Sequence, residues 1–186
     1  MGRVHHTEAT VPTHRMEARD FIWLAALGTA RRGAATLDDV CMAIDDIAGH
    51  LWTPVAEVVV GCVEDMLHDG TLAAYGTGDR FITTSRGDET LALLLALPMA
   101  HPACPLAQVA LRLKLAFVDL VSTELRRRCM EQAAMSYQRA LDGQARDCAT
   151  CGARGPFGRL WHDQDGERLG RELATLRAIA DFGCGP

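Results

Sequence analysis

Apolar residues recur at helical spacing in the first part of the chain, and cap residues mark where each helix begins and ends. The first predicted helix covers Ala18–Thr29. A second begins at Thr36, in a capping-box pattern with acids in its first turn, and ends at Gly49. A third is predicted from Thr53 and Pro54 to the glycine at 70, because threonine caps a helix well and proline suits its first position.

The period then changes from helical to alternating. Short strands are predicted at 71–75 and 80–84, joined by the Gly-Thr-Gly-Asp turn at 76–79, which together form a β-hairpin. Thr84 or Ser85 is expected to cap a fourth helix that runs to Leu97, where Pro98 stops it.

The second half predicts a long helix from about Leu106 to Leu141, a loop at 143–166 and a last helix at about 166–182. The long helix is apolar around most of its circumference, so more than one neighbour must cover it, and a second subunit is the expected source. The side chains expected at this dimer interface are Leu111, Leu115, Val118 and Leu125.

Three helices, a hairpin and another helix follow the order of a winged helix-turn-helix. The predicted fold class is therefore mainly α with a small β-hairpin: an N-terminal winged helix-turn-helix followed by a C-terminal helical dimerisation region. Residues 1–16 are expected to form a flexible tail, 17–98 the winged-helix domain and 104–186 the dimerisation region.

The composition narrows the function classes. The 186 residues hold no apolar run long enough to span a membrane, and the polar N-terminus lacks the apolar core of a signal peptide. Seven scattered cysteines, an odd number, do not resemble a secreted disulfide framework, so a cytoplasmic protein is expected. Charge is uneven, with a net of −7 over residues 1–100 and +2 over 101–186.

Several segments resemble the PadR family of bacterial transcriptional repressors. They are Leu24–Leu27 with the following Arg32-Gly33 turn, then Met66–Leu72, and above all Phe81-Ile-Thr-Thr84-Ser-Arg-Gly87, which is similar to the family segment that closes the wing. The resemblance covers roughly residues 18–182. It implies a homodimer that places the third helix in the major groove of a pseudo-palindromic operator and acts as a repressor.

The resemblance implies DNA contacts from a small set of side chains, since phosphate contacts position such a protein on its operator. They are Arg31, Arg32, Thr53, Arg80 and Arg86. For Arg31 and Arg32 the alternative is that they are solvated charges on a turn.

The third helix departs from the family pattern in its charge. Between Thr53 and Asp69 it has four acids and no Arg or Lys, and Val60 and Glu64-Asp65 stand where the family carries Tyr and basic residues. A second hypothesis is therefore a winged-helix interaction module that has lost DNA binding and uses this acidic helix on a basic protein partner.

Two residues are candidates for binding a small aromatic or carboxylate effector, a ligand class that the resemblance implies. Lys114, the only lysine, falls on an apolar face. Its alternatives are an ammonium that extends to solvent or pairs with Glu124. Trp161, in the predicted loop, is a candidate stacking residue.

Cys148 and Cys151 form the only motif typical of site chemistry. A Cys-x-x-Cys turn suits zinc or a redox pair, and unreactive free thiols are the alternative. A zinc site would need two further ligands, from His162, Cys184 or a partner subunit, and no cofactor is otherwise required. No Ser-His-Asp order, phosphate-binding Gly-rich loop or metalloprotease motif occurs, so an enzyme is not expected.

Overall fold

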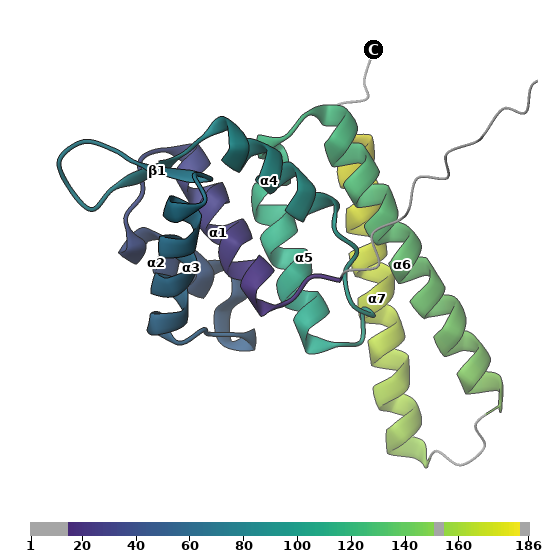
Figure 1. The fold of residues 1–186 in the computed structure, drawn as a ribbon. Helices are drawn as coiled ribbons and strands as arrows, with labels where there is room; N and C mark the ends of the chain where they lie inside the picture. Colours follow the sequence, from purple (N-terminus) through teal and green to yellow (C-terminus); the bar gives the residue numbers. More distant parts are fainter. Residues whose placement is uncertain (1–14, 151–154, 183–186) are drawn as a thin grey trace, which may run out of the picture.

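The computed structural model describes residues 15–150 and 155–182, with side chains for all of these except 147–150. In this part of the chain, seven α-helices, two short 3-10 helices and one hairpin make up the fold (Figure 1). The winged-helix elements are α1 (Ala18–Arg32), α2 (Leu37–Ala48), η1 (Gly49–Leu51), α3 (Ala56–His68), β1 (Leu72–Ala74), β2 (Phe81–Thr83) and α4 (Ser85–Ala96). The elements that follow are α5 (Pro105–Phe117), η2 (Val118–Leu120), α6 (Thr123–Thr150) and α7 (Pro156–Asp181).

Helix α2 begins and ends where its cap residues predict. The Thr36 hydroxyl accepts a hydrogen bond from the Asp39 amide at 3.2 Å, and the Asp39 carboxylate accepts one from the Thr36 amide at 2.8 Å. The Thr36 amide and hydroxyl both donate to the Asp39 carboxylate, and these two bonds hold the pKa of Asp39 below its usual value. At the other end Gly49 adopts φ 58°, a conformation that favours glycine.

Helix α3 begins later than the sequence predicts. It starts at Ala56, with Val55 in extended conformation before it, so Thr53 does not cap it and Pro54 is not its first residue. The Trp52 ring explains the shift, since it packs edge-on against Phe21 of α1 with ring centroids 5.4 Å apart. Trp52 itself is extended, which keeps the chain out of helical conformation as it leaves η1.

The predicted hairpin is confirmed. Strands β1 and β2 pair antiparallel, with Leu72 opposite Thr83, and the amide and carbonyl of Phe81 also bond those of Ala35. The Thr84 hydroxyl then caps α4 by accepting from the Gly87 amide at 3.1 Å. A β-carbon at position 87 would collide with the Thr71 carbonyl oxygen, so glycine lets the first turn of α4 lie against the segment that joins α3 to β1.

The predicted fold class is confirmed in its element order, with a winged helix-turn-helix followed by helices. The core of the winged helix is formed by buried side chains of α1, α2, α3, β2 and α4, including Leu24, Leu27, Ile44, Met66 and Leu91. The wing lies at one end of the molecule and the α6–α7 pair at the other (Figure 1).

The single long helix predicted for 106–141 is wrong, because the chain forms two helices there. Helix α5 ends at Phe117, and after η2 the chain is extended at Val121. The Ser122 hydroxyl accepts from the Leu125 amide at 3.3 Å in the first turn of α6. The break lets α5 pack against α1 and α2, so this chain's own winged helix covers much of the apolar circumference assigned to a second subunit.

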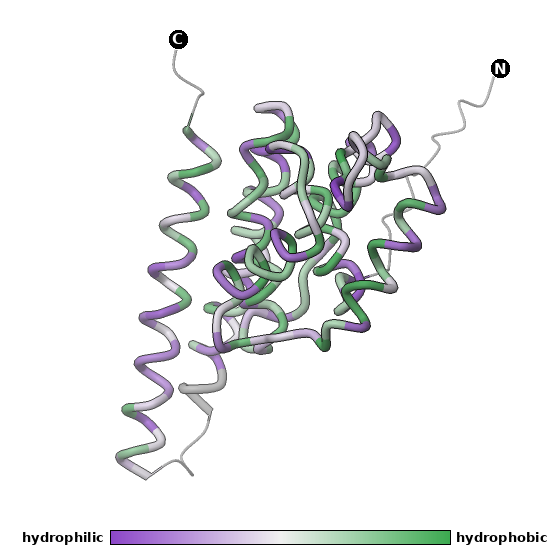
Figure 2. The backbone as a smooth tube through the Cα atoms, turned by 90° about the vertical axis from the view of Figure 1, so that its left-hand side faces the viewer, coloured by the Kyte–Doolittle hydropathy of each residue, from purple (hydrophilic) through white to green (hydrophobic). Residues whose placement is uncertain are grey.

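The predicted loop at 143–166 is also wrong over most of its length. Helix α6 continues to Thr150 and α7 already begins at Pro156, so Gly143 and Gly166 lie inside helices. The two helices pack side by side along their length (Figure 1), and α7 alternates hydrophobic and hydrophilic residues (Figure 2). Buried Leu169, Leu173, Leu176 and Ala180 of α7 stabilise the pair. Tertiary burial of this face outweighs the glycines, which each cost only about 1 kcal/mol in a helix.

Candidate DNA-contact surface and cationic pocket

The wing and the start of α4 carry two exposed arginines. Arg80 immediately precedes β2, and its carbonyl accepts a hydrogen bond from the Tyr75 amide at 2.8 Å across the hairpin. Arg86 lies in the first turn of α4. Neither guanidinium forms an ion pair with a carboxylate of the described residues. These two cations are therefore available to contact phosphate.

Arg31 and Arg32 both form ion pairs with carboxylates of their own chain. Arg31 pairs with Asp88 of α4 at 2.8 Å. Arg32 donates to Asp119 at 2.9 Å and to the Ala116 carbonyl at 2.9 Å. These contacts connect the end of α1 to α4 and to the end of α5, so the two arginines stabilise the packing of these helices.

The surface of α3 is acidic. Glu57, Glu64 and Asp65 are exposed, and among the described residues Arg19 alone forms a salt bridge with one of them, 2.8 Å from Asp65. The whole helix-turn-helix segment, residues 36–70, holds eight acids and no Arg or Lys. Thr53 is exposed in the segment before α3. The exposed face thus offers hydrogen-bonding and apolar groups to a partner, with a negative potential around them.

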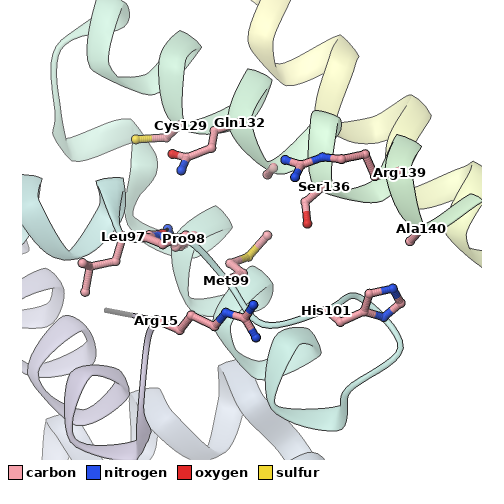
Figure 3. Close-up of a pocket in the computed structure, with 12 residues that line it drawn as sticks. Arg15, Leu97, Pro98, Met99, His101, Cys129, Gln132, Ser136, Arg139 and Ala140 are labelled. Atoms are coloured by element: carbon pink, nitrogen blue, oxygen red, sulfur yellow. Dashed lines mark hydrogen bonds between the residues drawn. The ribbon is translucent and has the colours of Figure 1, made fainter. Parts of the chain in front are cut away.

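A cavity of about 320 Å³ lies between the α4–α5 linker and α6 (Figure 3). We call it the cationic pocket. Its walls come from the segment that precedes α1, the linker, α5 and α6. They are Arg15, Leu97, Pro98, Met99, His101, Lys114, Cys129, Gln132, Ala133, Ser136, Arg139 and Ala140.

Lys114 lies in the wall of this pocket and is only 4% exposed. Its ammonium donates to the Leu95 carbonyl at 2.6 Å and to the Leu97 carbonyl at 2.5 Å, at the end of α4. Burial lowers the pKa of Lys114 to about 8, so the side chain still carries its proton at pH 7. The ammonium therefore neither extends to solvent nor pairs with Glu124, and it caps α4 from inside the fold.

Three other basic side chains line the cationic pocket. Arg15 and Arg139 are exposed at its rim, and no ion pair joins either to a carboxylate among the described residues. The His101 Nδ1 accepts from the Ala103 amide at 3.2 Å, which leaves Nε2 as the protonated nitrogen in the neutral ring. The lining contains no Asp or Glu, so the pocket has a positive potential.

The sequence-based selection of site residues missed Arg15, His101 and Arg139. They lie far apart along the chain, in a presumed tail, a linker and a helix, and no local motif joins them. The one signal in the sequence was Lys114 on an apolar face, because a lone buried cation needs polar partners in the fold.

The proposed effector residues Lys114 and Trp161 do not meet. Trp161 lies on α7 and is 69% exposed, beside a shallow groove lined by α7 residues alone.

The four residues expected at a dimer interface are at least partly covered by this chain itself. Leu111 and Val118 are buried within the single chain, and Leu115 and Leu125 are half-buried. Their assignment to a dimer interface stays a prediction.

The Cys148–Cys151 pair falls outside the residues whose side chains the structure describes, so the zinc or redox assignment stays a prediction. Within the described part no three His, Cys, Asp or Glu side chains gather as a metal site would require. Among the described cysteines, burial raises the pKa of the Cys62 and Cys129 thiols, which disfavours their reactive thiolate form.

The described helices include none with the length and apolar character needed to cross a membrane. Fold and geometry together define a winged-helix protein with a C-terminal helical pair and a positively charged cavity beside its linker.

Comparison with known proteins gives matches only among solved structures. No protein family model matches the chain, and no curated protein sequence does. The crystal structure of Bacillus subtilis PadR matches with a TM-score of 0.41 and 14% identity, covering 93% of this chain and 100% of that one. The same protein with p-coumaric acid matches with a TM-score of 0.41 and 14% identity, covering 92% and 99% of the two chains. With operator DNA the TM-score is 0.38 and the identity 15%, covering 87% and 98%.

Proposed function

We propose that this protein is a DNA-binding transcriptional regulator that acts as a homodimeric repressor. The observation that supports this most directly is the wing, which projects from the body and carries the exposed Arg80, while the exposed Arg86 lies in the first turn of α4; neither forms a salt bridge among the described residues. In winged helices the helix before the hairpin enters the major groove and the wing lies along the backbone. Here the wing supplies the phosphate contacts and α3 the base contacts.

Direct contacts between arginines and phosphates can support DNA binding despite the acids of α3. Coulombic effects between exposed groups fade beyond a Debye length of about 8–10 Å, so two arginines in direct contact with phosphates contribute more than any carboxylate beyond that distance. Amides at the start of α3 add contacts that need no basic side chain, because the amino end of a helix favours anions.

A gel-shift titration against the DNA upstream of the protein's own gene, at two salt concentrations, tests the proposal. Binding should weaken steeply with added salt. The Arg80→Ala, Arg86→Ala double variant should lower the steepness by roughly 2 per subunit on the log–log plot, since each phosphate contact contributes about 0.9. Arg31→Ala, at an arginine already paired with Asp88, is the control and should leave the slope unchanged. No salt-sensitive complex in the wild type would refute DNA binding.

The acidity of the helix-turn-helix favours a second candidate function, an interaction module for a basic protein partner. Residues 36–70 hold eight acids and no Arg or Lys, and two apolar side chains are exposed at the start of α3, Val55 at its N-cap (64%) and Val58 (52%). Glu64→Gln distinguishes the two functions. The change should strengthen DNA binding if α3 lies among phosphates, and should weaken binding of a Lys- and Arg-rich peptide if the module binds basic proteins.

The cationic pocket is the proposed effector site. It touches both the linker that leaves the winged helix and α6 of the C-terminal pair, so a ligand there contacts both parts. Binding shifts the spacing of the two DNA-binding domains only if the ligand has a higher affinity for one spacing. The zinc or thiol role of Cys148 and Cys151 is a separate proposal, which metal analysis of the purified protein tests.

A further inference from the structure

We propose that the cationic pocket binds a small polyanion, a molecule with two or more carboxylate or phosphoryl groups, and that it discriminates against aromatic monocarboxylates. This inference deepens the effector site of the proposed function, and it rests on that function only for its regulatory consequence. It follows from the charge, the depth and the chemical character of the lining.

The first argument is the number of charges. Arg15, Lys114 and Arg139 contribute three cations around about 320 Å³, with His101 as a further donor. None of the twelve lining residues is an acid. A single carboxylate would balance one of these three charges and leave the other two without a counterion in the pocket. Two or three anionic groups on one ligand match the site, because guanidinium and ammonium groups form their strongest hydrogen bonds with anionic oxygens.

The second argument is the position of the deepest cation. The Lys114 ammonium has three N–H donors, and two of them are bound to the Leu95 and Leu97 carbonyls. The third belongs to a side chain that is buried and lines the cavity. An anionic oxygen at the base of the pocket would accept this third bond. Such contacts in a desolvated position contribute more than those at a rim.

The third argument is the rest of the lining. Figure 3 shows Gln132 and Ser136 extending from α6 toward the space that the Arg15 guanidinium enters from the opposite side. The amide and the hydroxyl suit the oxygens of a polar ligand. No Phe, Tyr or Trp is among the lining residues, so the pocket offers no aromatic face to stack on a ring. Its volume lies at the small end of ligand pockets, which begin at about 300 Å³.

A polyanion bound in the cationic pocket would link three separate segments of the chain. Arg15 precedes α1, His101 belongs to the linker, and Arg139 lies on α6. A polyanion that contacts all three joins the winged helix to the C-terminal helices through the ligand. Because these cations repel one another without a ligand, a bound polyanion stabilises the observed arrangement of the three segments.

Isothermal titration calorimetry on the full chain without DNA tests the proposal. Citrate probes carboxylates and pyrophosphate probes phosphoryl groups, which distinguishes the two sources of negative charge. The comparison ligand is p-coumarate, and sodium chloride keeps the ionic strength equal in every titration. We expect citrate or pyrophosphate to bind. We expect p-coumarate to bind about tenfold more weakly or not at all, since its single carboxylate can pair with fewer of the cations.

Charge-removing variants locate the site. Arg15→Gln and Arg139→Gln, both at exposed positions, should each weaken polyanion binding about tenfold, the loss expected for one charged hydrogen bond. Arg171→Gln is the matched control. It is also an exposed arginine, 73% accessible on α7 beside the groove of Trp161, and it should leave binding unchanged.

Three results would overturn the proposal: neither citrate nor pyrophosphate binds the wild type, Arg139→Gln binds both as the wild type does, or p-coumarate binds more tightly than either polyanion. Because calorimetry is done without DNA, failure here is distinct from failure of the gel shift. If a polyanion binds but no operator complex forms, the ligand assignment of the pocket stands and only its regulatory role is refuted.

Discussion

The ring of Phe117 packs directly on Gly28, so closely that a β-carbon at position 28 would collide with it. Gly28 lies in the middle of α1, where glycine costs helix stability, and Phe117 is the last residue of α5. The Arg32 guanidinium lies over the same Phe117 ring, 6.0 Å from its centre. This contact sets how closely α5 approaches the winged helix.

Replacing Gly28 by alanine should therefore destabilise the protein although alanine is the better helix former. The added methyl group must displace a buried ring, and overpacking of this kind costs about 1–3 kcal/mol. Urea unfolding followed by circular dichroism measures the change. Gly33→Ala is the matched control, because nothing lies within 4 Å of a β-carbon there, and it should stay within about 0.5 kcal/mol of the wild type. Equal stability of Gly28→Ala and wild type would show that α5 does not pack as described.

The Thr84 hydroxyl holds the junction between α3, the wing and α4. It accepts from the Gly87 amide and donates toward the Gly70 carbonyl at 2.7 Å. Thr84→Ala should lower the free energy of unfolding by about 1–2 kcal/mol, the usual cost of losing a helix cap. Thr84→Ser keeps the hydroxyl and should recover most of the loss. If both variants were equally stable, the cap would contribute nothing.

Lys114 predicts an unusual pH dependence of stability. Its pKa is lowered from 10.5 in the unfolded chain to about 8 in the folded one, by burial. Between these values the unfolded chain binds more protons, so the contribution of Lys114 to the free energy of unfolding rises with pH. The gain is fully developed only above pH 10.5 and amounts to about 3 kcal/mol at most, at 1.36 kcal/mol per pH unit.

Comparison with Lys114→Met isolates this contribution, because other groups titrate equally in both proteins. The stability of the wild type minus that of the variant should increase from pH 7 to pH 10 in chemical unfolding. Loss of the two carbonyl contacts lowers the variant's stability at every pH and does not alter this slope. A difference that is flat with pH would mean that the Lys114 ammonium is not desolvated.

The start of α7 predicts where two copies of the chain meet. Phe157, Leu160 and Trp161 are 85%, 58% and 69% exposed and share one helical face near the free end of the α6–α7 pair. Exposed apolar clusters of this kind mark interaction surfaces. Trp161→Asp should shift the proposed homodimer toward monomer in analytical ultracentrifugation at micromolar concentration.

Met42→Asp is the control for this measurement, since Met42 is also 59% exposed but lies on α2. It should leave the association constant unchanged. A wild type that sediments as a monomer at micromolar concentration would refute both the homodimer and this assignment of its surface.

Much of the winged helix follows from local sequence. The Thr36–Asp39 capping box, the glycine at 49, the Gly-containing turn at 76–79 and the Thr84 cap act over three or four residues, so their effects can be recognised without knowing the fold. These signals determined the order of three helices, a hairpin and a fourth helix.

Tertiary structure decided the rest, because burial depends on which distant segments meet. Local pattern does not distinguish one long apolar helix from two, and the break at Val121 exists because α5 packs into the winged helix. The glycines at 143 and 166 suggest a loop by composition, yet the leucines of α7 gain enough by packing on α6 to keep both segments helical. The cationic pocket gathers Arg15, His101, Lys114 and Arg139 from four separate segments, and only the folded chain brings those charges together.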